Sequence, residues 1–304
     1  MSLVDFAIVG VPKSATTFIH YTVRTHPDVF MQENEDVTFL QEDWAERIPS
    51  FLAGATASRR RVAGMKRPDL LFSPDAARRM KSHNPAIKTI AVLRHPVERL
   101  VAHYFHLMGY CYIPLRDFDT GMRSLISGEM QKEWWRSFEV FAFSHYREAI
   151  ERFAEIIGPE NLHVVLHDDV KADAPTVARA VCGFLGLDFE GKVTFPSGRP
   201  QKVVYSLDRL RFLRHRNEAT MQLDEFGRAI KVTSRALTPQ ERAWEMVVKQ
   251  FDEKVIAPIS DNAPPRLSTE LWEKIYPQFR DDILYVERLL GRELPTWHAN
   301  PLAA

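Results

Sequence analysis

A lysine and several hydroxyl residues lie close together near the N-terminus, within residues 10–17. Lys13 supplies a cation. The hydroxyl groups belong to Ser14, Thr16 and Thr17, beside the expected start of a helix. The first turn of a helix has backbone N–H groups without intrahelical acceptors, and it favours phosphate or sulfate. These residues therefore predict an anion-binding turn. An ordinary strand-to-helix turn with capping hydroxyls is the alternative that this stretch alone leaves open.

The turn differs from a Walker A loop in the position of its lysine. The Walker pattern G-x-x-x-x-G-K, followed by Ser or Thr, has its lysine directly after a second glycine. Here Lys13 lies three residues after Gly10, the only glycine of the turn, and Pro12 stiffens the backbone between them. The spacing therefore argues against a Walker-type loop.

Two arginines form a second candidate anion site. The apolar run at residues 87–93 is typical of a buried strand, and Pro96 suits the first turn of the helix that follows. Arg94 and Arg99 lie across this helix start. Combined with the Lys13 turn, they suit a ligand with two separated phosphates, because arginine binds phosphate through paired N–H groups. Either arginine alone is more typical of a surface or salt-bridge residue.

The elements that must position these residues alternate between strands and helices. Apolar runs predict strands at residues 6–9, 87–93 and 162–166, and helical periodicity follows each of them. This alternation indicates an α/β fold in which helices flank a parallel sheet. Ligands of such sheets bind beyond the carboxyl ends of the strands. If the first two of these strands are central and adjacent, their turns face one pocket.

No linker divides the chain, so we expect a single domain over residues 1–304. Basic residues concentrate at 196–235, which is typical of a solvated face and also suits a mobile segment that covers donor or acceptor. Aromatic residues concentrate at 110–143, where core packing is favoured over an acceptor-binding wall.

The composition narrows the class of protein. Lys and Arg number 40 and balance 40 Asp and Glu, so the overall charge gives no case for nucleic acid or an anionic membrane as a partner. Cys111 and Cys182 are too few for a metal cluster, and we expect both to be reduced. No apolar stretch reaches the roughly 18 residues of a membrane span. These features predict a soluble, cytoplasmic, enzyme-sized protein, and they do not indicate an oligomeric state.

The sequence resembles the sulfotransferases that use 3′-phosphoadenosine 5′-phosphosulfate (PAPS), in particular their bacterial and heparan-sulfate-type branch. Residues 10–17 are similar to the family's 5′-phosphosulfate loop, and residues 93–99 to its 3′-phosphate segment. Weaker similarities lie at 64–68, to a G-x-K-S/T-P element, at 167–170, to Y-E-D-L, and at 286–297, to the closing helix. The resemblance covers nearly the whole chain.

The resemblance implies a P-loop-like three-layer fold and in-line transfer of a sulfuryl group from PAPS. The acceptor would be a hydroxyl or amine of a small molecule, a saccharide or a carrier-bound group. No metal ion is required, because a sulfuryl group carries less charge than a phosphoryl group.

The resemblance also implies roles for individual residues. Lys13 would stabilise the leaving oxygen, and Glu35 would be the general base. His103 is the alternative base, since histidine has an unperturbed pKa of about 6.5. The residues that the resemblance assigns to donor binding are Pro12, Lys13, Ser14, Ala15, Thr16, Thr17, Arg94, Arg99 and Arg199.

Three positions depart from the family's pattern. Ala15 replaces a glycine, which adds a methyl group and is compatible with a helix start. Asn34 replaces the lysine that precedes the base. Ala102 replaces a serine, so one hydrogen bond to the 3′-phosphate is missing, a loss of about 1.5–3 kcal/mol. Two alternatives stay open. One is a nucleotide-dependent kinase, in which a strand, loop and helix also bind phosphate, and the other is a non-catalytic nucleotide-binding protein of the same fold, with which Ala102 is consistent.

Overall fold

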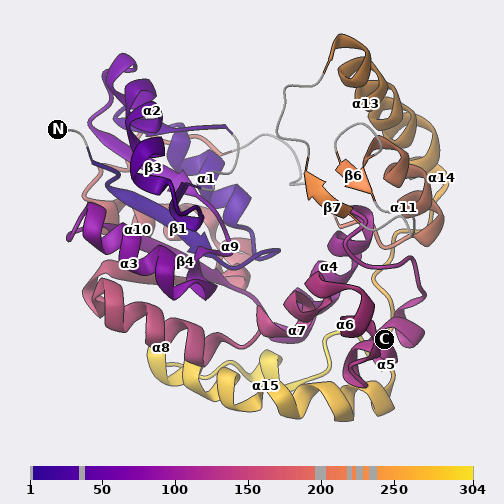
Figure 1. Ribbon diagram of the computed structural model, residues 1–304. Coiled ribbons are helices and arrows are strands. Elements are labelled where there is room, and N and C mark those ends of the chain that lie inside the picture. The colour runs from indigo at the N-terminus through magenta and orange to yellow at the C-terminus, as the bar shows by residue number, and fades with distance from the viewer. Residues whose placement is uncertain are drawn as a thin grey trace. The chain divides into compact units, whose positions relative to one another are not determined.

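The apolar run near the N-terminus forms the middle strand of a five-stranded, all-parallel sheet (Figure 1). The structure is a computed structural model that describes residues 3–33, 38–195, 203–217, 221–223, 229–232 and 238–303. Across the sheet the strand order is β2-β3-β1-β4-β5. The strands are β1 (Phe6–Gly10), β2 (Val29–Met31), β3 (Val62–Lys66), β4 (Lys88–Leu93) and β5 (Leu162–Leu166).

The three strands predicted from apolar runs are confirmed as β1, β4 and β5. The sequence pattern did not predict β2 and β3. β2 has only three residues, and the apolar run of β3 is interrupted by Gly64 and Lys66. Such short or mixed segments carry little periodic signal, and pairing with neighbouring strands determines their conformation.

Two compact units alternate along the sequence. The first comprises Met1–His95 and His145–Gln201, and the second comprises Pro96–Ser144 and Lys202–Ala304. Each unit is built from two separate stretches, which explains why no linker is visible along the chain. The expectation of a single domain stays a prediction.

Helices flank the sheet of the first unit. They are α1 (Thr16–Arg24), α2 (Trp44–Ala57), α3 (Pro74–His83), α8 (Tyr146–Ile157), α9 (His167–Ala172) and α10 (Ala174–Leu185), with short 3-10 turns at Thr38–Leu40, Leu70–Phe72 and Pro159–Asn161. Apolar side chains of β1 and β4 form one cluster with those of α1 and α10. The chain moves from β1 toward β2 in one direction and from β3 toward β4 and β5 in the other. Right-handed crossovers therefore place α1 on one face and the contacting helices α3 and α8 on the other.

The second unit is built around α4, whose residues are almost all buried. Its helices are α4 (Pro96–Gly109), α5 (Phe118–Ile126), α6 (Glu129–Glu133), α7 (Glu139–Ala142), α11 (Leu207–Leu213), α13 (Pro239–Phe251), α14 (Ala257–Ile259) and α15 (Thr269–Leu290), with short turns at Trp135–Phe138, Arg214–Arg216, Asp252–Ile256 and Pro295–His298. Strands β6 (Met221–Leu223) and β7 (Ala229–Val232) pair antiparallel. Apolar side chains of α4, α5 and α15 form one core cluster.

The aromatic segment of the second unit divides between core and surface. Trp134 and Phe141 pack against the core cluster, as the core-packing interpretation expects. Trp135 and Phe138 are 67% and 46% exposed. Cys111 and Cys182 are free and buried. None of the helices in the described parts of the chain combines the length and the apolar character that a membrane crossing needs.

Close packing of β3 against β1 generates a prediction for Gly64. A Cβ atom at this position would lie 2.1 Å from Cζ of Phe6, a fully buried ring in the sheet core. Overpacking a core typically costs about 1–3 kcal/mol, so we expect Gly64→Ala to lower the free energy of unfolding by that amount. Chemical denaturation measures the change.

Gly183 provides a matched control on α10, since a Cβ atom there meets no atom within 4 Å. Alanine stabilises a helix interior relative to glycine by roughly 0.5–1 kcal/mol, so Gly183→Ala should raise the free energy of unfolding. Equal effects of the two substitutions would contradict the close contact of β3 with the Phe6 ring.

Candidate functional site

The turn between β1 and α1 has the backbone of an anion-binding concavity. Lys13 and Ala15 both adopt left-handed conformations, with φ of 69° and 70°, on either side of Ser14. Ala15 is the N-cap residue of α1, and among the described residues it provides no side-chain cap for this helix. The backbone groups of such a turn form a nest of N–H donors that suits phosphate or sulfate oxygens. The capped-turn alternative therefore finds no support in the geometry of α1.

Ser14 provides a direct test of whether the turn fits an anionic group. Its side chain is fully buried, and its Oγ atom has no hydrogen-bond partner among the described residues. A buried hydroxyl without a partner costs free energy, and such a group in a native structure calls for an explanation. An anion oxygen in the turn would accept its hydrogen bond, so this residue fits a phosphosulfate ligand.

A second lysine reaches the same turn from β3. Lys66 is 5% exposed, and its Nζ donates a hydrogen bond to Oγ1 of Thr17 at 3.1 Å. Parallel pairing of Ile8 with Lys66 places this residue beside β1, near the carboxyl end of both strands. Sequence reasoning assigned no role to Lys66, although the similarity of residues 64–68 to a lysine-containing family element was a usable signal.

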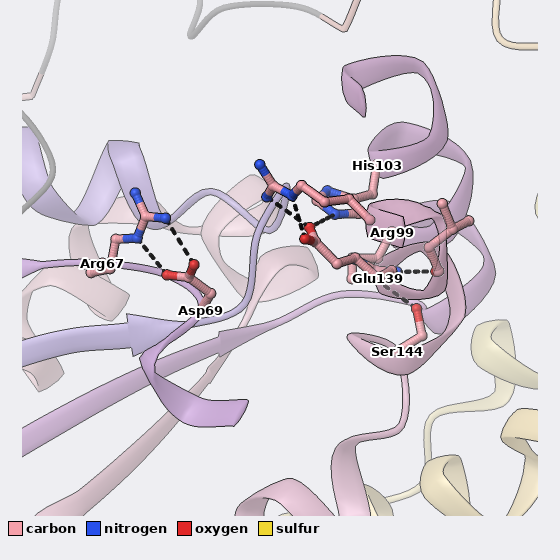
Figure 2. A network of polar contacts seen from close by, with 8 residues as sticks. Arg67, Asp69, Arg99, His103, Glu139 and Ser144 are labelled. Carbon is pink, nitrogen blue, oxygen red and sulfur yellow. Dashed lines mark hydrogen bonds and ion pairs between the residues drawn. The ribbon is translucent and has the colours of Figure 1, made fainter. Parts of the chain in front are cut away.

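Arg67, the next residue, is paired nearby in the first unit. Its guanidinium forms two hydrogen bonds of 2.6 and 2.8 Å to the carboxylate of Asp69 (Figure 2). Its backbone N–H donates to the carbonyl of Ile8. The backbone bond ties the residue after Lys66 to β1, and the side-chain pair links two residues of the loop that follows.

Arg94 approaches the turn from β4. β1 and β4 are adjacent, which is the condition under which their turns were expected to face one pocket, and they flank the point at which the chain reverses direction across the sheet. Such a switch point is where ligands of open α/β sheets bind. The Arg94 guanidinium donates to the carbonyl of Lys13 at 3.2 Å, and Tyr146 donates its phenolic hydrogen to the carbonyl of Arg94 at 2.7 Å. The structure thus brings Lys13, Lys66 and Arg94 to one edge of the sheet.

The second predicted arginine has different surroundings. Arg99 is fully buried inside the second unit, where its Nε donates to Oγ of Ser144 at 2.6 Å (Figure 2). Its Nη2 donates to the carbonyls of Glu139 and Val140, and Ser144 in turn donates to the carbonyl of Pro96 at 2.9 Å. These bonds tie α4 to α7. The predicted contact of Arg99 with a donor phosphate stays a prediction.

His103 belongs to the same buried network. It is 3% exposed, and its Nε2 lies 3.3 Å from Oε2 of Glu139 (Figure 2). Arg136 binds the same carboxylate through two hydrogen bonds of 2.5 and 2.9 Å. His106 stacks on the His103 ring with 5.8 Å between centroids. The predicted role of His103 as a base stays a prediction, for a ring with little solvent exposure.

Several predicted positions fall outside the described residues. Asn34 and Glu35 belong to residues 34–37, and Arg199 belongs to residues 196–202. The basic segment at 196–235 is described only in part. Within it, Arg209 forms two 2.7 Å hydrogen bonds to the carboxylate of Asp252. Where the chain is described, no group of three or more His, Cys, Asp or Glu side chains is placed to hold a metal ion.

Comparisons with known proteins agree on one family. A family model described as a sulfotransferase domain matches residues 3–253. A crystal structure of a sulfotransferase from Alicyclobacillus acidocaldarius shares the fold, with a TM-score of 0.64, 18% identity and coverage of 98% of this chain and 100% of that chain.

Two further proteins that this chain is similar to are also described as sulfotransferases. The sulfotransferase domain from the curacin biosynthetic pathway has a TM-score of 0.45 and 15% identity, over 97% of this chain and 99% of that chain. The membrane-associated sulfotransferase kil1 of Dictyostelium discoideum is 26% identical over 108 residues, which are 34% of this chain and 23% of that protein.

Ala15, which stands where the family has a glycine, has a left-handed backbone at the helix start. A left-handed conformation costs a residue other than glycine roughly 1–2 kcal/mol of folding free energy, and glycine avoids this strain. Glycine also makes the unfolded chain more flexible, which lowers the free energy of unfolding by about 0.4–1 kcal/mol. We therefore expect Ala15→Gly to raise the free energy of unfolding by about 0.5–1 kcal/mol. Chemical denaturation provides the measurement.

Ala180 is the matched control, because it is an exposed alanine in the interior of α10. Ala180→Gly should lower the free energy of unfolding by about 0.5–1 kcal/mol. If Ala15→Gly destabilised the protein as much as Ala180→Gly, residue 15 would not be left-handed in solution.

Proposed function

The chain belongs to the sulfotransferase domain family, and from that premise we propose that it transfers a sulfuryl group from PAPS to a hydroxyl or amine acceptor. The observation that carries the proposal is the gathering of Lys13, Lys66 and Arg94 around an uncapped helix N-terminus in the first unit. Basic side chains beside the N–H groups of a helix start suit an anionic ligand. PAPS carries anionic groups at both its 5′ and 3′ positions and is such a ligand.

In the proposed reaction one bond forms, one bond breaks and one proton is transferred. The acceptor oxygen or nitrogen attacks sulfur, the bond between sulfur and the bridging oxygen breaks, and adenosine 3′,5′-bisphosphate (PAP) leaves. Lys13 stabilises the negative charge that develops on the bridging oxygen, and the N–H groups of the turn hold the 5′-phosphosulfate. Lys66 holds the hydroxyl of Thr17 toward the same group. Positioning and electrostatics supply most of the rate enhancement, as in phosphoryl transfer.

Arg94 binds the 3′-phosphate in this proposal. Its guanidinium already lies against the turn through its hydrogen bond to the Lys13 carbonyl, and its backbone is anchored by Tyr146. Arg99 supports the start of α4 through its bonds to Ser144 and two carbonyls. Since Arg99 is already committed to internal partners, Arg94 is the better supported of the two predicted contacts.

Glu35 accepts the proton of the acceptor in this proposal. A carboxylate suits this role because it is ionised at neutral pH and acts as a general base when it lies within hydrogen-bond reach of the acceptor. The alternative base, His103, is 3% exposed and shares the Glu139 carboxylate with Arg136. This burial favours Glu35. Acceptors of the proposed reaction are small molecules, saccharides or carrier-bound groups.

Binding of PAP tests the donor site independently of the acceptor. A ligand that binds only the native state at 100 times its Kd stabilises the protein by about 2.7 kcal/mol, so saturating PAP should raise the melting temperature measurably. ATP with magnesium should raise it less. A larger shift with ATP and magnesium would favour a nucleotide-dependent kinase, and no shift with either would contradict the proposed donor site.

Single-turnover sulfation tests the role of the lysines. A panel of phenols, alcohols and saccharides incubated with radiolabelled PAPS identifies an accepted substrate by mass spectrometry. With that substrate, we expect Lys13→Ala to lower the rate about 100-fold to 1,000-fold, because a preorganised charge on the leaving oxygen is lost. Lys66→Ala should lower the rate less, since it acts through Thr17.

Lys249 is a suitable control, because it is an exposed lysine on α13. Lys249→Ala should leave the sulfation rate unchanged. Equal rates for Lys13→Ala and Lys249→Ala would refute the assignment of Lys13, whereas PAP binding without sulfation by the wild-type protein would favour the non-catalytic alternative.

A further inference from the structure

A cavity of about 480 Å³ lies beside the edge strand β2 in the first unit, and the proposed mechanism does not use it. Residues of α1, of β2 and of the segment that follows α2 form its walls. The lining includes two arginines, Arg24 and Arg60, one tyrosine, Tyr21, and the apolar side chains of β2. Binding sites for small organic molecules have volumes of roughly 300–1,000 Å³, so this cavity is large enough for one ring system.

The length of α1 separates this cavity from the anion-binding turn. The turn precedes Thr16, and Arg24 is the last residue of this nine-residue helix, which is about 13 Å long. Arg60 comes two residues before β3, whose first residue, Val62, pairs with Val29 at the beginning of β2. The two arginines therefore lie toward the amino edge of the sheet, whereas the turn follows β1 at the carboxyl edge. The cavity is a separate site.

Both arginines keep hydrogen-bond donors for a ligand. Arg24 is partly buried and forms no hydrogen bond or ion pair with another described residue. Arg60 donates from Nη1 to the carbonyls of His26, at 3.1 Å, and Pro27, and these bonds orient its guanidinium. Its Nε and Nη2 atoms have no acceptor in the described parts of the chain. A guanidinium oriented in this way suits an anionic group, because it binds through paired N–H groups.

The positive charge of the cavity is not balanced by carboxylates among the residues described around it. None of the described lining residues is Asp or Glu. Asp28, which directly precedes β2, is bound by Arg61 at 2.6 Å. The C-terminal ends of α1 and α2 also meet the cavity, and their carbonyls would repel an anion. These carbonyls accept hydrogen bonds from the C-cap residues, Thr25 and Ser58, which reduces the repulsion.

The strand side of the cavity is apolar. The Phe30 ring packs edge-to-face on Phe51, with 5.7 Å between centroids. A Cβ atom at Gly54 would lie 2.8 Å from Cζ of Phe30, so α2 holds this ring closely in place. Met31, the next residue, is 4% exposed. A fixed aromatic ring beside a thioether provides a surface on which an apolar ring of a ligand can pack.

We propose that this cavity binds a second ligand, an organic anion that combines one anionic group with an apolar ring. Arg24 and Arg60 bind the anionic group through charge-assisted hydrogen bonds, and the ring packs on Phe30 and Met31. The Tyr21 hydroxyl, which has no hydrogen-bond partner among the described residues, is a further donor in the same wall. This inference goes beyond the proposed function and does not depend on it, because no lining residue belongs to the proposed donor site.

Calorimetric titration of the full chain with naphthalene-2-sulfonate tests this inference. We expect one molecule to bind with a Kd below about 1 mM. Naphthalene-2-sulfonamide has the same shape without the charge, and inorganic sulfate has the charge without the rings. Each should bind at least about tenfold more weakly, because the first lacks the charge-assisted hydrogen bonds and the second lacks the apolar contact.

Substitution of each arginine locates the bound sulfonate. Arg24→Ala and Arg60→Ala should each weaken the binding of naphthalene-2-sulfonate about tenfold, since each removes hydrogen bonds to a charged group. Arg60 also binds two backbone carbonyls, so its loss affects the loop before β2. Arg24 makes no such bond in the described structure, and Arg24→Ala therefore decides the question even if Arg60→Ala does not fold.

Arg59 provides the matched control, because it is adjacent to Arg60, exposed and absent from the described lining of the cavity. Arg59→Ala removes the same charge and should keep the wild-type affinity, as should Lys13→Ala at the anion-binding turn. Equal losses for Arg59→Ala and Arg60→Ala would show a general effect of charge and overturn the proposal. Weaker binding by Lys13→Ala, equal affinity for the sulfonate and the sulfonamide, or no binding of the sulfonate would also overturn it.

Discussion

Parallel pairing of β1 with β3 on one side and β4 on the other is the constraint on which the candidate site depends. Because parallel strands end at the same edge, the residues that follow them meet there whatever their distance in sequence. Lys66, Arg94 and the Lys13 turn are brought together in this way. Lys66 is held in place by its hydrogen bond to Thr17, and Arg94 by its hydrogen bond to the Lys13 carbonyl.

Backbone strain accompanies this arrangement. Lys13 and Ala15 are both left-handed, a conformation that costs an L-residue roughly 1–2 kcal/mol. The buried Ser14 hydroxyl between them adds the cost of a polar group without a hydrogen-bond partner in the described structure. Strained conformations of this kind are kept only where the surrounding structure holds them in place, and they are common at binding sites. Here the buried strand β1 and the helix α1 fix both ends of the turn.

The two arginines around the start of α4 show how burial changes the use of one residue type. Arg94 follows β4 at the carboxyl edge of the sheet, where its guanidinium donates to the carbonyl of Lys13. Arg99 lies within a helix that is buried on nearly all sides, and a buried guanidinium is tolerated only with several acceptors. Ser144 and the carbonyls of Glu139 and Val140 provide them. Arg99 thus holds α4 and α7 together, whereas Arg94, five residues earlier, faces the proposed ligand.

Local patterns in the sequence were sufficient to predict the strands with continuous apolar runs and the residues that form the turn. Neighbouring residues alone define the apolar runs of β1, β4 and β5 and the position of Lys13 after Gly10. These features can therefore be recognised in the sequence before the fold is known. Only the tertiary structure decided that Lys66 lies beside this turn and that Arg99 is buried among partners of its own unit. Those facts depend on strand order and on packing between segments far apart in sequence, which no local pattern encodes.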